Sequence, residues 1–125
     1  MTELKIYRCA KCGKIMVTLH DAPVPVMCCG EQMQLLSANT TDAAVEKHVP
    51  VIERIDGELY ATVGSTEHPM IPEHYIEFVV LETEKGFRVQ YLQPGEAPRV
   101  KLLKGENVKA VYAYCNLHGL WKTEA

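Results

Sequence analysis

The sequence lacks the features that would place the protein in a membrane, in a secretory pathway or on nucleic acid. No apolar stretch approaches the roughly 20 residues that a helix needs to cross a bilayer, and residues 1–6 contain no apolar run of signal-peptide length. Acidic and basic residues are mixed along a chain of net charge −3, without a long basic stripe. We therefore expect a cytoplasmic protein that binds neither membranes nor nucleic acid.

The sequence also has little that would form helices. Its apolar residues mostly alternate with polar ones, which favours strands, and we find no amphipathic helix, internal repeat or low-complexity segment. The chain has 125 residues, 47% of them hydrophobic. That length allows one modest core and a small appendage. We expect an all-β protein.

Residues 1–36 predict a small unit of short strands punctuated by cysteines. Strands are expected around Ile6, at 14–19 and at 32–36. Prolines at positions 23 and 25 interrupt the chain between them, because proline lacks a backbone donor and fixes φ. Cys28-Cys29-Gly30 is expected to turn the chain.

Residues 37–125 predict a larger β unit. Residues 37–45 are small and polar, which is typical of a linker or loop, and longer strands follow. Asp56-Gly57 between two alternating segments is a strong hairpin signal. The expected strands are 51–55, 59–63, 75–81, 87–92, 100–103 and 108–114. Short strands at near-regular spacing predict a sandwich or barrel.

Four of the five cysteines form two pairs within the first unit, which predicts a metal site. A Cys9-x-x-Cys12 turn directs two sulfurs at one ion, and Cys28-Cys29 supplies a second pair. Thiols in a reducing compartment are not expected to form disulfides, and a metal would stabilise a unit with so small a core. The second pair is vicinal, so we expect a distorted tetrahedron. Spacing alone leaves zinc and iron equally open.

The fifth cysteine begins a second candidate site. Cys115-x-x-His118 presents a thiolate and an imidazole from one turn, and Cys115 is the only cysteine outside the first cluster. His68 and His74 bound a loop that two prolines stiffen, and His48 lies two residues before another proline. His20 lies beside a polar turn and is expected to be an ordinary surface residue. The three segments are far apart, so spacing alone does not prove that they converge.

These motifs resemble those of the desulfoferrodoxin family. Cys9-x-x-Cys12 with Cys28-Cys29-Gly30-Glu31 is similar to its desulforedoxin-like module. The superoxide reductase domain of the family is matched by the segments 46–52, 64–70, 74–77 and 114–121. Because all four N-terminal cysteines are present, the resemblance is to the two-iron class, and it runs nearly end to end.

The resemblance implies a tetrathiolate iron domain at 1–36 and an immunoglobulin-like β-sandwich at 37–125, usually in a homodimer. The first iron would be held by Cys9, Cys12, Cys28 and Cys29. The second would have His48, His68, His74 and His118 in a plane and Cys115 axial. The implied activity is that of a superoxide reductase, which reduces superoxide to hydrogen peroxide without releasing oxygen. Its electrons would come from a rubredoxin-like donor.

The resemblance also gives roles to two residues beside the second site. Lys47 would attract the superoxide anion, and Glu46 would occupy the open position of the iron after turnover. Tyr112, Tyr114 and Trp121 are expected in the core or site wall. Two other classes of function stay open on the residues alone. They are a zinc-stapled binding module and an electron carrier in which the tetrathiolate iron is the working centre.

Overall fold

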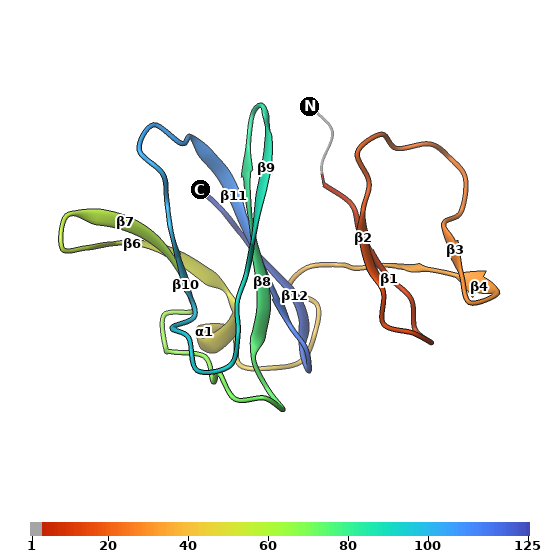
Figure 1. Ribbon diagram of the computed structural model, residues 1–125, viewed down its shortest axis with the longest axis horizontal. Helices are drawn as coiled ribbons and strands as arrows, with labels where there is room; N and C mark the ends of the chain where they lie inside the picture. Colours follow the sequence, from red (N-terminus) through yellow and green to blue (C-terminus); the bar gives the residue numbers. More distant parts are fainter. Residues whose placement is uncertain (1–3) are drawn as a thin grey trace. The chain divides into compact units, whose positions relative to one another are not determined.

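The computed structural model describes residues 4–125, which divide after Ser37 into two compact units. Figure 1 draws the first unit in red to orange and the second from yellow to blue. In the part of the chain described, the one helix is a four-residue turn and the remaining regular elements are strands. The prediction of an all-β protein is confirmed.

The first unit consists of very short strands. A sheet in the order β2-β1-β5 and a separate hairpin of β3 and β4 make up the unit. Their bounds are β1 Ile6–Arg8, β2 Ile15–Val17, β3 Met27–Cys28, β4 Glu31–Gln32 and β5 Gln34–Leu35. Among its described residues only Ile6, Cys9 and Met33 are buried. So little buried apolar surface makes a stabilising metal physically attractive.

The second unit contains two antiparallel sheets. One has the order β10-β7-β6 and the other β12-β11-β8-β9. Its elements are α1 Val45–His48, β6 Pro50–Ile55, β7 Glu58–Val63, β8 Ile76–Thr83, β9 Gly86–Tyr91, β10 Arg99–Lys101, β11 Val108–Cys115 and β12 Gly119–Glu124. Seven strands divided three and four match the strand count of an immunoglobulin-like sandwich.

The core of the second unit follows from the period of its strands. Mostly alternate residues of β7, β8 and β11 share one buried cluster with residues of and beside β10 and with Leu92, just after β9. The cluster contains Ala61, Val63, Ile76, Val79, Leu81, Leu92, Val100, Leu102, Val111, Ala113 and Cys115. Cys115, at the end of β11, is therefore both a core residue and a candidate ligand.

The hairpin expected at Asp56-Gly57 is confirmed, but two elements were not expected. Asp56 and Gly57 adopt positive φ between β6 and β7, as a tight hairpin turn requires. Strand β12 was missed because it begins directly after the Cys115–His118 turn, whose residues were interpreted as ligands. Residue 45 was assigned to a linker, yet it starts the α1 turn.

Strand ends meet where the candidate ligands lie. Pro50, at the start of β6, pairs with Val63 at the end of β7. Cys115, at the end of β11, pairs with Ile76 at the start of β8 and with Gly119 at the start of β12. Segments far apart in sequence thereby reach one edge of the sandwich.

Within residues 4–125, no helix has the length and apolarity that crossing a bilayer demands.

Candidate metal centres

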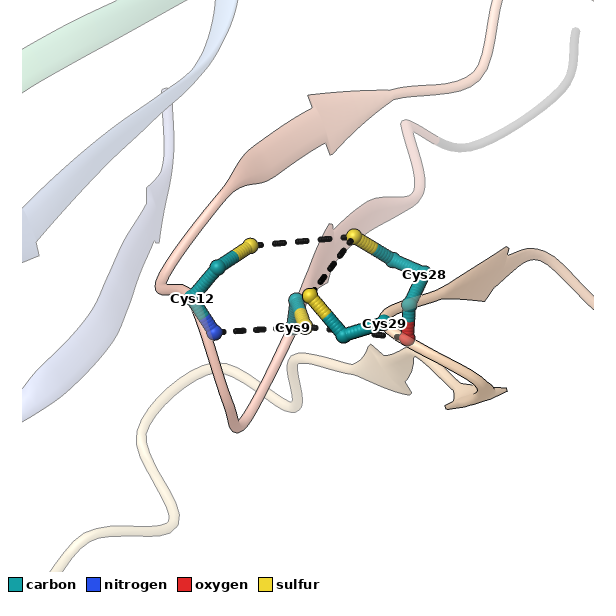
Figure 2. Close-up of side chains that lie close together, drawn as sticks. All are labelled: Cys9, Cys12, Cys28 and Cys29. Atoms are coloured by element: carbon teal, nitrogen blue, oxygen red, sulfur yellow. Dashed lines mark hydrogen bonds between the residues drawn. The ribbon is translucent and has the colours of Figure 1, made fainter.

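The four cysteines of the first unit converge as their spacing predicted. Figure 2 shows their side chains gathered around one region. The sulfur of Cys28 lies 3.7 Å from that of Cys12 and 3.9 Å from that of Cys29. Sulfurs bonded to one tetrahedral ion at about 2.3 Å would be ~3.8 Å apart. All five cysteines of the chain carry free thiols, so the cluster is a metal-type site and not a disulfide pair.

Backbone conformation explains how two adjacent cysteines can face one ion. Neighbouring side chains of an extended strand point to opposite faces. Cys29, however, has a φ of 53° and Gly30 a φ of 76°, so the chain turns sharply between β3 and β4. Non-glycine residues rarely adopt this left-handed conformation. The turn brings the Cys29 sulfur back toward that of Cys28.

The crowded thiols resist ionising together. Hydrogen bonds from the backbone amides of Cys12 and Lys11 lower the pKa of Cys9 to about 6. The pKa of Cys29 rises to about 12, because side-chain hydrogen bonds with the sulfurs of Cys12, Cys9 and Cys28 hold the proton on its thiol. A cation at the centre would remove this conflict by binding all four as thiolates.

The second cluster brings together the four histidines and the cysteine named above. The ligand atoms of His48, His68, His74 and Cys115 all lie within 4.8 Å of one another. His118 joins through Nδ1, which lies 3.1 Å from His48 Nε2 and 3.9 Å from the Cys115 sulfur. The three sequence segments therefore do converge.

The four imidazoles lie at the corners of an approximate square. Neighbouring ring centroids are 4.7–5.1 Å apart around the circuit His48, His68, His74, His118. His48 and His74 are 6.4 Å apart across it. Neighbouring rings are inclined by 75–88°, so each presents an edge to the next. Four ring nitrogens can thus face one central point.

Hydrogen bonds to the backbone fix which nitrogen of two histidines faces that point. His48 Nδ1 lies 2.7 Å from the Ala44 carbonyl oxygen, and His68 Nδ1 lies 2.7 Å from that of Pro69. Each Nδ1 must carry the proton, since a carbonyl only accepts. Burial lowers the pKa of both rings, that of His68 to about 4. Their Nε2 atoms therefore carry no proton, and each has a lone pair available for a metal.

Two observations show that these residues fit a cation. The bare Nε2 atoms of His48 and His68 face each other at 3.1 Å, where no proton is available to join them. His74 Nε2 is buried and has no hydrogen-bond partner among the described residues. Unpaired buried polar atoms are costly, and histidine nitrogens are common metal ligands. A metal ion between the rings would satisfy all of them.

Cys115 completes the donor set from within the core. Burial raises the pKa of its thiol, while hydrogen bonds from the backbone amides of Leu117 and His118 oppose that rise. A soft thiolate with several imidazoles suits iron, copper or zinc better than magnesium or calcium. Metal binding here would release the thiol proton.

Asn116 ties the thiolate turn to the His74 segment. Its side-chain oxygen accepts a hydrogen bond from the Tyr75 amide at 2.9 Å, and its Nδ2 donates to the Glu73 carbonyl at 3.0 Å. Its backbone amide donates to the Tyr75 carbonyl. Asn116 was not among the site residues expected from the sequence, although its place inside the Cys-x-x-His turn was a signal.

Close backbone packing positions the α1 turn that carries His48. A Cβ on Gly64 would lie 2.7 Å from the Glu46 carbonyl oxygen and 2.9 Å from that of Val49. The Glu46 oxygen also accepts a hydrogen bond from the Thr66 amide. Only glycine allows this approach, so the loop after β7 fixes the position of α1.

The remaining named residues occupy different surroundings. Glu46 and Lys47 are exposed on α1, next to His48. Burial is the main cause that lowers the pKa of His48 and of His74, and the positive charge of Lys47 lowers both further, so it acts on opposite corners of the square. His20 is exposed and belongs to neither cluster. Tyr112, Tyr114 and Trp121 are buried, as expected.

Comparison with known proteins relates both units to one family. Residues 40–124 match the model of the desulfoferrodoxin family, and residues 1–36 match that of its N-terminal domain. The desulfoferrodoxin of Desulfarculus baarsii is 43% identical and that of Nitratidesulfovibrio vulgaris 44% identical. Each of these matches covers 98% of this chain, and 97% and 98% of the relative. A crystal structure of the superoxide reductase from Treponema pallidum is 37% identical, with a TM-score of 0.77. That match covers 98% of this chain and all of the other. The chain belongs to the desulfoferrodoxin family.

Proposed function

We propose that this protein is a superoxide reductase whose active site is the cluster of four imidazoles and one thiolate. The observation that carries the proposal is the convergence of five donors on one point at the end of a rigid sandwich. The iron supplies, when bound, the single electron that converts superoxide and two protons into hydrogen peroxide. His48, His68, His74, His118 and Cys115 would hold it. Five protein donors leave one position of a six-coordinate ion for substrate.

The donor set suits this task for reasons that lie in the chain itself. Burial keeps the rings of His48 and His68 neutral by lowering their pKa, and the backbone acceptors keep the remaining proton on Nδ1, so each Nε2 is ready to bind a metal near neutral pH. Cys115 is buried, which keeps water away from the sulfur. A thiolate donates electron density to iron, as in haem-thiolate proteins.

Lys47 and Glu46 are the proposed catalytic residues outside the donor set. Superoxide is an anion and the chain has a net charge of −3, so a local cation is needed to attract it. Lys47 supplies that charge from an exposed position on α1. Glu46, one residue earlier, is the carboxylate proposed to cover the open position between turnovers. Ionised carboxylates only accept hydrogen bonds and suit ferric iron as oxygen donors.

We assign the second iron to the four-cysteine cluster in residues 1–36, with Cys9, Cys12, Cys28 and Cys29 as ligands. The family binds two iron centres, and the four sulfurs have the spacing of a tetrathiolate site. Cys12 and Cys29 are exposed, so electrons could reach this centre at the surface. A rubredoxin-like protein is the proposed donor.

The proposed setting is a homodimer in the cytoplasm. Free thiols suit a reducing compartment. The family resemblance implies the homodimer, and Leu19 and Val24 in the first unit, which are 87% and 71% exposed, are candidate contact residues. Sedimentation of the iron-loaded protein would test the dimer.

The function is tested by mixing the anaerobically reduced, iron-loaded protein with superoxide. Loss of superoxide, formation of hydrogen peroxide and evolution of oxygen would be followed together. We expect peroxide without oxygen, one iron oxidised per superoxide consumed, and loss of this activity in His68→Ala. His20→Ala is the matched control, because it removes the one histidine outside the cluster. Oxygen evolution, or full activity in His68→Ala, would overturn the proposal.

A further inference from the structure

Trp121, the only tryptophan of the chain, contacts two of the clustered histidines. Its indole stacks on the His48 ring, with centroids 4.8 Å apart and an interplanar angle of 24°. Its Nε1 donates a hydrogen bond to the His118 carbonyl oxygen at 3.1 Å. The side chain is 1% exposed, so both contacts lie out of water. One side chain thus joins two proposed ligands from opposite ends of the domain.

The two histidines that Trp121 joins are neighbours in the square. His48 Nε2 and His118 Nδ1 lie 3.1 Å apart, although the residues are 70 positions apart in sequence. Rotating either ring would move its donor atom away from the common point. Stacking restricts the plane of the His48 ring, and the indole hydrogen bond restricts the turn that carries His118.

Strand β12 supports the same corner of the site through a second residue. Trp121 and Thr123 lie on one face of β12, two residues apart. The Thr123 hydroxyl donates a hydrogen bond to the carbonyl oxygen of Pro50 at 2.5 Å, just after the α1 turn. Strand β12 therefore holds the junction between α1 and β6 at two points. Trp121 is the one of these two that contacts the ligands.

We propose that Trp121 is a positioning residue that couples His48 to His118 and thereby sets the donor geometry of the metal site. The inference rests on the proposed metal centre and not on its reaction with superoxide. Residues that orient metal ligands typically contribute about 10- to 100-fold to metal affinity. The alternative is that Trp121 only fills space in the core, and substitution can separate the two.

The test compares three variants of the iron-loaded protein. Trp121→Phe keeps an aromatic plane against His48 but loses the hydrogen bond to His118. Trp121→Leu loses both. Phe78→Leu is the matched control, because it removes an aromatic ring of the same sheet that stacks on Tyr114 at 5.4 Å and on no ligand. The measurements are the rate of iron loss to a chelator, the midpoint potential of the histidine site and its thiolate charge-transfer band.

We expect iron loss about 10-fold faster in Trp121→Phe and about 100-fold faster in Trp121→Leu. Both should shift the midpoint potential and the charge-transfer band, while the tetrathiolate iron in the same molecule keeps its spectrum. Phe78→Leu should leave all three unchanged. Equal effects in Trp121→Phe and Phe78→Leu, or an unshifted band in Trp121→Phe, would overturn the inference. If Trp121→Leu does not fold, Trp121→Phe still decides. A superoxide assay that fails with both irons in place would refute only the function.

Discussion

At the scale of single residues, the histidine site depends on ring protons that are hydrogen-bonded to backbone carbonyls outside the site. The carbonyls of Ala44 and Pro69 hold the Nδ1 protons of His48 and His68, so both Nε2 atoms are free to bind a metal. The chain sequence names the histidines but not these acceptors, because backbone carbonyls are the same in every residue. Which ring nitrogen faces the centre is therefore a property of the folded chain.

Lys47 gives the first prediction at this scale. Replacing it with alanine should lower the second-order rate of superoxide consumption about tenfold and weaken its dependence on ionic strength, because one attracting charge is lost. Stopped-flow mixing at several salt concentrations measures both. Lys104→Ala removes an equal charge from an exposed loop and should change neither. An unaltered rate and salt slope in Lys47→Ala would refute the steering role.

Asn116 gives the second prediction at the scale of single residues. Asn116→Ala removes the side-chain hydrogen bonds to Tyr75 and to the Glu73 carbonyl, which join the Cys115 turn to the His74 segment. We expect a loss of about 1–2 kcal/mol in the free energy of unfolding and roughly tenfold faster iron loss. Urea unfolding and chelator kinetics measure these. Asn107→Ala, in an exposed loop, serves as the control, and equal results for the two variants would contradict the prediction.

At the scale of elements, the proposed ligands of the histidine site lie at strand ends or in the segments that lead into and out of them. Register shifts between Tyr114 and Cys115 show that β11 departs from regular pairing with β8 where it reaches the site. Irregularities of this kind often re-aim a side chain near a functional site.

Away from the site, Arg88 on β9 joins the loop after β10, with two hydrogen bonds to Glu106 and one to the Lys101 carbonyl.

The Arg88–Glu106 pair predicts a pH-dependent stability. The hydrogen bonds from Arg88 hold the pKa of Glu106 below its ordinary value of 4.5. As pH falls below that value, the unfolded chain takes up a proton before the folded one does, so the stabilisation is lost. Glu106→Gln should cost about 1–2 kcal/mol at pH 7, and this difference should shrink below about pH 4.5. Urea unfolding from pH 7 to 3 tests it, with the exposed Glu84→Gln as control. A difference independent of pH would contradict it.

At the scale of the whole molecule, each unit carries its own complete donor set. All four clustered sulfurs belong to residues 4–37, and the histidine site draws only on residues after Ser37. The first unit buries few side chains, whereas the second has an extended core between its sheets. The units should therefore depend on their metals to different degrees.

Reciprocal substitutions test this independence. Cys9→Ser should reduce iron from two to one per chain, abolish the tetrathiolate spectrum and leave the histidine site and its activity intact. His68→Ala should do the reverse. Proteolysis should become faster in the first unit of Cys9→Ser, because the metal there contributes much of the folding free energy. Iron analysis, visible spectra and limited digestion measure these effects. Loss of both irons in either variant would show that the sites are coupled.

Most of the strand pattern, the hairpin at Asp56-Gly57 and the four-cysteine cluster could be predicted from the residues alone. These depend on local rules of alternation, turn chemistry and ligand spacing, which short segments carry. The residues alone did not reveal β12, which begins directly after the Cys115–His118 turn, or the α1 turn that carries His48.

The meeting of His48, His68, His74 and the Cys115 turn depends on the tertiary structure, because pairing within the two sheets brings these segments to one edge. The tertiary structure alone decided that Cys29 turns back through a left-handed backbone, that Gly64 packs against α1 and that Trp121 joins His48 to His118. Each of these relations joins chain segments or backbone states that residue spacing does not encode. The physical reason is that the conformational entropy lost in forming such contacts is offset by the packing of the whole domain and not by local propensity.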